Sequence, residues 1–219
     1  MGIQERKRRE KEKRRRQIII AAKKVFSSRG FNKTTMEDIA KKAELSPGTI
    51  YLYFKNKDEL FASLSMRILQ YLSARINSID FEAELTSKQR MEMLKDAFLD
   101  VYKFDPLILA NMFHLQSSET LNNLSPQLLS DIRKLSNNAL NPIARIFDEG
   151  IQQGEFININ PFFMANIIWG MFSGIVLWEE NKKTIRKRGE HLKQTLETAF
   201  LIFSRGITKK PTAYTPTVN

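Results

Sequence analysis

The sequence predicts an all-helical protein, and three observations lead to this prediction. Apolar residues recur three and four positions apart in nearly every segment, which is the spacing of one helix face. No segment sustains the alternation of apolar and polar residues that marks a half-buried strand. Glycine and proline interrupt the pattern at intervals typical of helix ends. We expect about nine helices, arranged as a three-helix head (residues 1–56), a larger helical body (57–208) and a loose tail (209–219).

The first predicted helix has an apolar stripe over Ile18, Ala22, Val25 and Phe26. It should end near Arg29, because Gly30 tolerates the left-handed backbone that often terminates a helix. Upstream, three glutamates each precede an arginine by four positions, a spacing that supports a helix. The amino-terminal end could equally fray, so the sequence leaves open whether residues 1–16 are helical or disordered on their own.

A second, short helix is predicted after Thr34 and Thr35. Either hydroxyl can accept a hydrogen bond from the free amides of the first helical turn. The helix should run to about Lys42, and a tight connection over residues 43–45 should follow it. Within this connection we expect Glu44 to keep a conventional backbone conformation, because a residue other than glycine rarely adopts the left-handed one.

The third helix is predicted over residues 47–53. Ser46 can cap its first turn, and Pro47 suits the first helical position, where its missing amide hydrogen costs nothing. Two short helices joined by a tight turn fit a helix-turn-helix, in which the second helix enters the major groove of DNA. The expected core of the head consists of Val25, Phe26, Ile39, Ile50, Leu52 and Phe54.

Six further helices are predicted in the body from the same periodicity. Proline and glycine residues mark most of their ends, and one helix should continue, with a kink, through Pro142. The expected helices lie at about 57–79, 91–104, 107–113, 126–152, 161–181 and 187–206. The fifth of these is apolar on all sides, and its 17-residue apolar stretch over 162–178 is shorter than the ~20 residues that cross a bilayer. We therefore expect it to be a buried helix.

Composition argues against catalysis. The chain has no cysteine and only two histidines, His114 and His191, so no Cys/His metal site can be assembled. No phosphate-binding glycine loop and no nucleophile-elbow motif is present. The five-residue apolar run over 18–22 is shorter than the roughly 7 to 15 residues of a secretory signal. These features predict a cytoplasmic protein that is not an enzyme and needs no metal or cofactor.

Positive charge is concentrated in the first quarter of the chain. The formal net charge is +11, yet residues 1–60 hold 17 basic and eight acidic residues, and the remainder is almost balanced. Such asymmetry points to a polyanionic partner for the head, because neutralising phosphates releases condensed counterions. Double-stranded DNA fits this partner best, and an anionic membrane surface is the alternative.

The residues of the head also carry a family resemblance. In order, they are Gly30-Phe31, Thr34-Thr35, Ile39-Ala40, Ala43, Leu45-Ser46, Gly48-Thr49, Tyr51, Phe54 and Lys57. Over residues 15–61 this string resembles the DNA-binding domain of the TetR family of transcriptional regulators. The layout of a small head followed by a long helix and a larger body is also similar to that family. One departure is Glu44, which stands where the family usually has glycine.

Roles in DNA binding can be assigned to several of these residues. Gly48 lets the third helix approach DNA closely, and Pro47 and Thr49 are the expected base readers. The resemblance implies that Tyr51 contacts a phosphate or a base and that Tyr53 contacts a phosphate. Lys57 should hold another phosphate at the amino end of the fourth helix. The full predicted contact set is Thr34, Thr35, Ser46, Pro47, Gly48, Thr49, Tyr51, Tyr53, Lys55 and Lys57.

Residues 6–16 form a basic arm that holds nine of the 35 basic side chains. The arm could be a solvated helix end. It could also track phosphates or enter the minor groove, as arms do in other helix-turn-helix proteins.

The body should dimerise, because one recognition helix covers only half of a two-fold operator. Gly170 and Gly174 permit close helix approach, either between subunits or within one. The resemblance implies a four-helix interface formed by residues 161–181 and 187–206 of two subunits. The predicted interface residues are Gly170, Gly174, Trp178, Leu196, Phe200 and Phe203.

The resemblance also implies an effector in the body that shifts the fourth helix and weakens DNA binding. Large or pliable apolar side chains with a few polar groups suit an apolar or amphipathic small molecule. The predicted effector contacts are Phe98, Tyr102, Met112, Phe113, His114, Phe147, Trp169 and Phe172. The resulting hypothesis is a homodimeric, ligand-responsive repressor of a palindromic operator. A basic peripheral membrane protein is the alternative.

Overall fold

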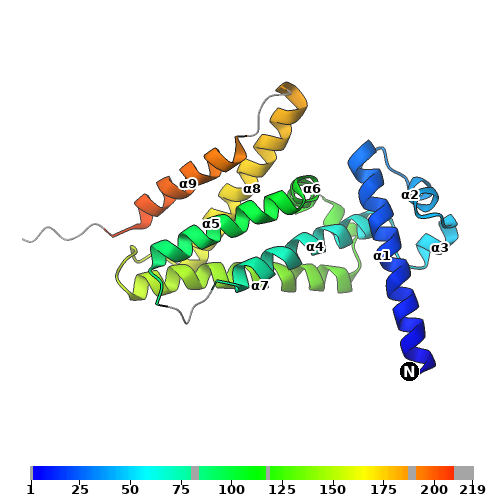
Figure 1. Cartoon of the computed structure of the whole chain (residues 1–219), viewed down its shortest axis with the longest axis horizontal. Helices are drawn as coiled ribbons and strands as arrows, with labels where there is room; N and C mark the ends of the chain where they lie inside the picture. Colours follow the sequence, from blue (N-terminus) through cyan, green and yellow to red (C-terminus); the bar gives the residue numbers. More distant parts are fainter. Residues whose placement is uncertain (1, 80–83, 117–118, 187–190, 210–219) are drawn as a thin grey trace, which may run out of the picture. The chain divides into compact units, whose positions relative to one another are not determined.

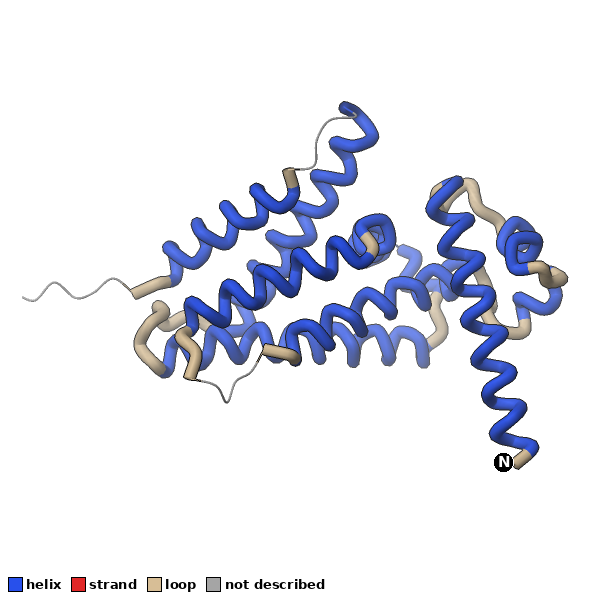
Figure 2. Tube along the Cα trace, in the orientation of Figure 1, coloured by secondary structure: helices blue, strands red, loops and turns tan. Residues whose placement is uncertain are grey.

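The computed structural model describes residues 2–79, 84–116, 119–186 and 191–209, and helices make up most of this part of the chain (Figures 1 and 2). In order, the elements are α1 (Ile3–Arg29), α2 (Met36–Ala43), α3 (Pro47–Tyr51), α4 (Lys57–Asn77), α5 (Ser87–Phe104), α6 (Pro106–Gln116), the 3₁₀ turn η1 (Glu119–Asn123), α7 (Pro126–Gln152), α8 (Pro161–Arg186) and α9 (Leu192–Ile207). The prediction of an all-helical fold with about nine helices is confirmed. The predicted tail lies, from residue 210 onward, outside the described residues.

The chain divides into two compact units. The first unit comprises residues 1–70 and 105–135, and the second comprises residues 71–104 and 136–219. The helices α4 and α7 each contribute residues to both units. The predicted head therefore shares its unit with the start of α4, with α6 and with the start of α7.

The core of the first unit forms where α1 packs against α2 and α3. Ile18, Phe26, Ile39 and Ile50 are almost fully buried there, as the apolar stripes predict. Phe61 of α4 joins this core, with its ring centroid 5.2 Å from that of Phe26 in an edge-to-face arrangement. Burial of side chains of this size contributes about 1.5–3 kcal/mol each, so these few residues supply most of the stability of the head.

The turn between α2 and α3 departs from the prediction. Glu44 has φ 57° and ψ 42°, a left-handed conformation, and not the conventional backbone that we expected. Its amide donates to the carbonyls of Ala40 and Lys41, and the Leu45 amide donates to Ala40 at 3.0 Å. These bonds satisfy the last carbonyls of α2, and they require a left-handed residue whatever its side chain. Glu44 therefore adopts the backbone conformation that the turn requires, although a residue other than glycine rarely adopts it.

The second unit has an aromatic core in which α5, α7, α8 and α9 take part. The Phe98 ring stacks on Phe172 at 4.3 Å between centroids, and Phe200 meets it edge-on at 5.9 Å. At the end of α7, a Cβ atom on Gly150 would lie 2.3 Å from the ring of Phe156. Only glycine fits there, so α7 can end closely against the segment that leads into α8.

Helix α8 is not the buried helix that we expected. Phe163 is 63% exposed and Trp178 is 62% exposed, and Phe162 and Ile167 are also exposed. The opposite face, which includes Met164, is buried in the second unit. The segment Pro161–Lys182 is 22 residues long and contains an 18-residue window with a mean hydropathy of 1.5, so by length and composition alone it could cross a membrane. The apolar stretch over 162–178 keeps its 17 residues, and the helix continues past Trp178 through the charged residues Glu179 and Glu180.

The left-handed turn yields a stability prediction. Glu44→Gly should raise the free energy of unfolding by about 1 kcal/mol, because an L-residue in this conformation costs roughly 1–2 kcal/mol and glycine is spared that cost. Urea denaturation followed by circular dichroism measures the change. The matched control is Glu37→Gly in the right-handed helix α2, which should lower stability by up to about 1 kcal/mol. A loss of stability in Glu44→Gly would contradict the analysis of the turn.

Candidate nucleic-acid interface

The start of α2 is held by a reciprocal pair of hydrogen bonds between Thr35 and Asp38. The Asp38 amide donates to Thr35 Oγ1 at 3.1 Å, and the Thr35 amide donates to Asp38 Oδ2 at 3.1 Å. The Thr35 amide is also the main reason that the pKa of Asp38 lies below its usual value. Arg29 Nη1 lies 2.7 Å from Asp38 Oδ1 and ties α1 to this cap. Helix α2 is thereby fixed at its first turn.

The start of α3 is capped by Ser46, as the sequence predicts. Ser46 Oγ accepts a hydrogen bond from the Thr49 amide at 3.2 Å and lies 2.8 Å from Thr49 Oγ1. Pro47 occupies the first helical position, and the helix ends at Tyr51, two residues earlier than predicted. The cap holds the two hydroxyl groups side by side at the exposed start of α3.

The outer surface of α3 is open. Ser46, Pro47 and Gly48 are exposed, and Thr49 is half-buried. A Cβ atom on Gly48 would meet nothing within 4 Å, so no part of the described chain covers this position. Tyr51 is 49% exposed. These residues form a continuous surface, which we call the α3 face, against which another molecule can pack.

Leu52 is a correction to the predicted core, because it is 80% exposed. Ile50 and Phe54 lie four residues apart and both point inward, so the residue midway between them points away from the core. Tyr53 is half-buried beside it. The sequence signal for an outward Leu52 was available in this spacing, but apolar character alone suggested burial.

Besides Ser46 and Thr49, three further predicted DNA contacts take part in internal bonds. Thr34 is buried and its hydroxyl donates to the Gly30 carbonyl at 2.7 Å, so the structure turns this side chain inward. The ammonium group of Lys57 donates to the carbonyls of Phe31 and Thr34 at 2.9 and 3.0 Å. The Thr35 side chain forms the cap described above, and Lys55 is exposed.

The basic arm is helical from Ile3 onward, which answers the question that the sequence left open. The predicted Glu5–Arg9 pair forms at 3.1 Å. Glu10 pairs with Arg6 at 3.2 Å and not with Arg14, whose guanidinium donates to Gln17 at 3.0 Å. All of these side chains apart from half-buried Gln17 are exposed.

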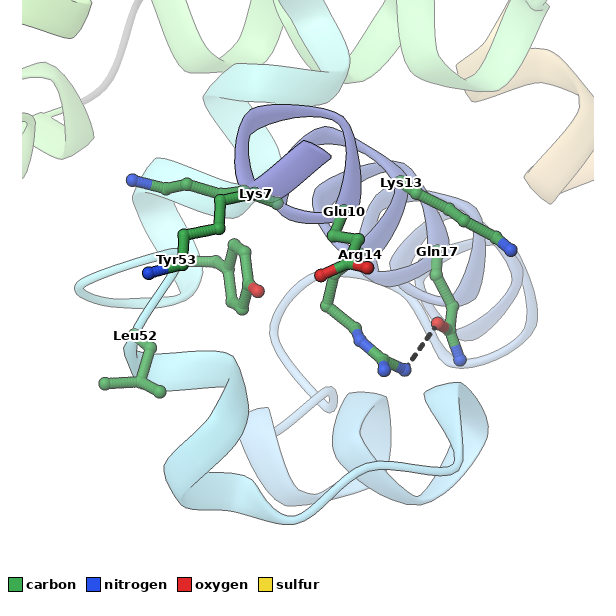
Figure 3. Close-up of a pocket in the computed structure, with 8 residues that line it drawn as sticks. Lys7, Glu10, Lys13, Arg14, Gln17, Leu52 and Tyr53 are labelled. Carbon is green, nitrogen blue, oxygen red and sulfur yellow. Dashed lines mark hydrogen bonds between the residues drawn. The ribbon is translucent and has the colours of Figure 1, made fainter. Parts of the chain in front are cut away.

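A groove lies between this arm and the end of α3 (Figure 3). Its volume is about 680 Å³. Side chains of α1 form one wall and the two residues that follow α3 form the other (Figure 3). The lining residues are Lys7, Glu10, Lys11, Lys13, Arg14, Gln17, Leu52 and Tyr53. The groove forms because the arm continues α1, which the sequence left open.

The predicted effector residues are divided between the two units. Phe98, Tyr102, Phe147, Trp169 and Phe172 belong to the second unit, and all but half-buried Trp169 are buried. The Tyr102 hydroxyl donates to Glu180 Oε1 at 3.1 Å. Met112 and Phe113 are buried in the first unit, and the side chain of His114 lies outside the described part of the structure.

The predicted dimer residues separate into exposed and buried groups. Gly170, Gly174 and Trp178 are exposed on α8, and added Cβ atoms on the two glycines would meet nothing within 4 Å. The alternative that these glycines pack within one subunit is therefore wrong for the described chain. Leu196 and Phe200 are buried in the second unit, so they do not line its surface. Phe203 is partly buried, with its ring 5.8 Å from that of Phe147.

Sequence reasoning missed part of the exposed apolar surface on these helices. Phe163 lies four residues before Ile167, and Ile167 lies three residues before Gly170. Both residues therefore continue the stripe of the two glycines on α8. On α9, Ile202 is exposed beside a shallow hollow of about 420 Å³. Among the described residues, no group of three or more potential metal ligands comes together.

Comparisons with known proteins agree with this architecture. Residues 18–64 match the family model described as bacterial regulatory proteins, tetR family. Residues 79–209 match the model described as QacR-like protein, C-terminal region. The transcriptional regulator YhgD of Bacillus subtilis is 26% identical over 168 residues, which cover 76% of this chain and 85% of that protein. The fatty acid metabolism regulator protein of the same species is 30% identical over 136 residues, 62% of this chain and 66% of that protein.

Solved structures share the fold. The TetR-family regulator PfmR of Thermus thermophilus superposes with a TM-score of 0.68 at 19% identity and covers 86% of this chain and 97% of that one. The regulator FadR of Bacillus subtilis, solved in complex with stearoyl-CoA, gives a TM-score of 0.65 at 25% identity, with 87% and 98% coverage. Because the two family models together span the head and most of the remaining chain, the chain belongs to the TetR family of helix-turn-helix transcriptional regulators, with a QacR-like carboxyl-terminal region.

Proposed function

We propose that this transcriptional regulator is a ligand-responsive repressor that binds a palindromic operator as a homodimer and is released by an apolar or amphipathic effector. Members of its family regulate transcription and are not enzymes. The observation that carries the proposal is the open α3 face in a strongly basic head. A regulator of this kind acts where the DNA is, so we also propose a cytoplasmic location.

The α3 face is suited to the major groove. Thr49 and Pro47 can reach base edges, while Ser46 and Tyr51 can donate hydrogen bonds to phosphates. Gly48 allows the helix to approach the DNA backbone without a side chain between them. In this proposal Lys55 adds a phosphate contact from its exposed position, and Lys57 keeps the internal bonds that hold α4 to the preceding loop.

The homodimer rests on the exposed stripe of α8. Phe163, Ile167, Gly170, Gly174 and Trp178 follow one helix face, and this face is apolar without being covered. Large exposed apolar patches mark interaction surfaces, and small residues within them let two helices approach closely. A two-fold axis through this face would pair two heads for the two halves of a palindrome.

The effector proposal rests on the aromatic cluster of the second unit. Phe98, Trp169 and Phe172 offer apolar contacts, and the Tyr102–Glu180 pair supplies polar groups beside them. A site with these features suits a ligand with an apolar chain and a polar end. Because a similar regulator was solved with stearoyl-CoA, we propose a long-chain acyl thioester as the effector class to test.

A basic peripheral membrane protein remains the second hypothesis, since the arm and the exposed face of α8 could both meet an anionic bilayer. Binding to a selected duplex with a steep salt dependence favours the regulator. Affinity for anionic vesicles without duplex binding favours the membrane protein.

Removing one hydroxyl tests the α3 face. Tyr51→Phe should weaken binding to a duplex selected from random DNA by about ten-fold, because a hydrogen bond to a charged group contributes about 1.5 kcal/mol. Fluorescence anisotropy measures the affinity. Tyr71→Phe removes the same hydroxyl outside the head and should leave the affinity unchanged. Equal affinities for the wild type and both variants would show that Tyr51 does not contact DNA through its hydroxyl.

A charge on the exposed stripe tests the dimer. Gly174→Glu should convert the protein from dimer to monomer in sedimentation velocity, because it would bury two carboxylates at the seam. The added Cβ meets no atom within the chain, and glutamate favours a helix more than glycine does, so the fold should be kept. Asn138→Glu, at an exposed position on α7, is the matched control and should stay dimeric. A dimeric Gly174→Glu protein would place the seam elsewhere.

Addition of ligand tests the effector class. Stearoyl-CoA should lower operator affinity by about 5- to 150-fold, the usual range of coupling between two sites, and free CoA should have no effect. Fluorescence anisotropy of the operator complex measures the release. If acyl-CoA thioesters of several chain lengths all leave the affinity unchanged, this effector class is wrong, while the proposed binding of DNA is unaffected.

A further inference from the structure

One face of α1 changes character along its length. Lys7, Lys11, Arg14 and Ile18 follow each other at spacings of four, three and four, so they lie on one helix face. Ile18 is fully buried against the core of the head, whereas the other three side chains are exposed. This helix face packs on the head from Ile18 onward. In the residues that precede Ile18, the same face carries a row of cations.

This cationic row lines the groove described above, opposite Leu52 and Tyr53 (Figure 3). Side chains at the end of the arm hold it to the rest of the unit. The Gln17 side-chain amide donates to the Ala43 carbonyl at 2.7 Å, and Arg15 Nη2 donates to Ser63 Oγ at 3.2 Å. Because Leu52 and Tyr53 directly follow the α3 face, a molecule docked on α3 can continue into the groove.

The residues that line the groove include more cations than carboxylates. Glu10 lines it too, but its carboxylate is paired with Arg6, on the adjoining side of the arm. Within the described part of the chain, Lys7, Lys11 and Arg14 form no ion pair with a carboxylate. Three cations without a carboxylate partner attract a row of phosphates more strongly than ion-paired cations do, because no ion pair must be broken.

The helical form of the arm limits which part of DNA it can meet. An α-helix with its side chains is about 10–12 Å across, and the minor groove is about 6 Å wide. The arm therefore does not enter the minor groove as an extended peptide would. Its cationic face is suited to the outside of one phosphate backbone.

We propose that the groove between the arm and the end of α3 holds one phosphate backbone of DNA just outside the half-site. This inference rests on the proposed function and adds to it a second contact surface, formed by Lys7, Lys11 and Arg14. Residues 3–14 rise about 18 Å along the helix axis, which corresponds to about five base-pair steps. The arm thus lengthens the contacted duplex without reading bases, because phosphates carry no direct sequence information.

Two triple variants with the same net charge distinguish phosphate binding in the groove from diffuse electrostatic attraction between the arm and DNA. The groove variant combines Lys7→Gln, Lys11→Gln and Arg14→Gln. The control combines Arg8→Gln, Arg9→Gln and Arg16→Gln, which lie on other faces of the same arm. Glutamine favours helices about as well as lysine and arginine, and circular dichroism checks that both variants stay helical. The probe is a duplex recovered by the wild-type protein from random DNA.

In this test the groove variant should bind the duplex about ten-fold or more weakly, and its slope of log affinity against log salt should fall by about 5.4, because the dimer loses three cations in each of its two arms. The control should change the slope by less than about one. Five flanking base pairs added outside each half-site should strengthen binding by the wild type and not by the groove variant. Flanks of different sequence should act alike.

Equal losses of affinity and slope in the two triple variants would overturn the inference, because they would indicate diffuse attraction. A preference for particular bases in the flanks would also overturn it. In both cases the operator would still be bound, so the proposed function would stand. If the wild-type protein recovers no duplex from random DNA, the proposed function itself fails and the inference fails with it.

Discussion

The apolar face of α1 begins at Ile18, and the organisation of the DNA-binding end of the molecule depends on this boundary. From Ile18 onward, α1 buries its stripe against α2 and α3 and so fixes the helix-turn-helix. Before Ile18 the same face carries Lys7, Lys11 and Arg14, which are exposed, while Arg15 and Gln17 on other faces still contact the head. One continuous helix thereby positions both the α3 face and the row of cations beside it.

Polar groups in the head are divided between internal structure and a surface for a partner. Thr34, Thr35 and Lys57 have the chemistry to bind phosphate, but the structure uses their side chains to hold the loop and the start of α2. Ser46 and Thr49 also bond to each other, yet they remain at an open surface. Internal bonds of this kind make the frame rigid, and a rigid frame reduces the entropy that α3 loses on docking.

Helix α8 has two apolar faces, of which one is buried and the other is exposed. One packs into the aromatic core of the second unit, where Phe172 stacks on Phe98, and the other is exposed along Gly170, Gly174 and Trp178. A helix that is apolar on all sides is normally buried on all sides. Within this single chain, only one side of α8 is buried. In the proposed homodimer the second face is buried by another copy, so the same helix connects effector binding to the spacing of the heads.

The sequence by itself determined the helices, their order and the helix-turn-helix, because periodicity, caps such as Ser46 and terminators such as Gly30 act over a few residues. It also indicated the TetR family. Tertiary structure alone decided the left-handed backbone at Glu44, the burial of Leu196 and Phe200, and the groove beside the arm. These features depend on which helix faces meet in space and on which backbone carbonyls a turn must satisfy. The local sequence does not specify either.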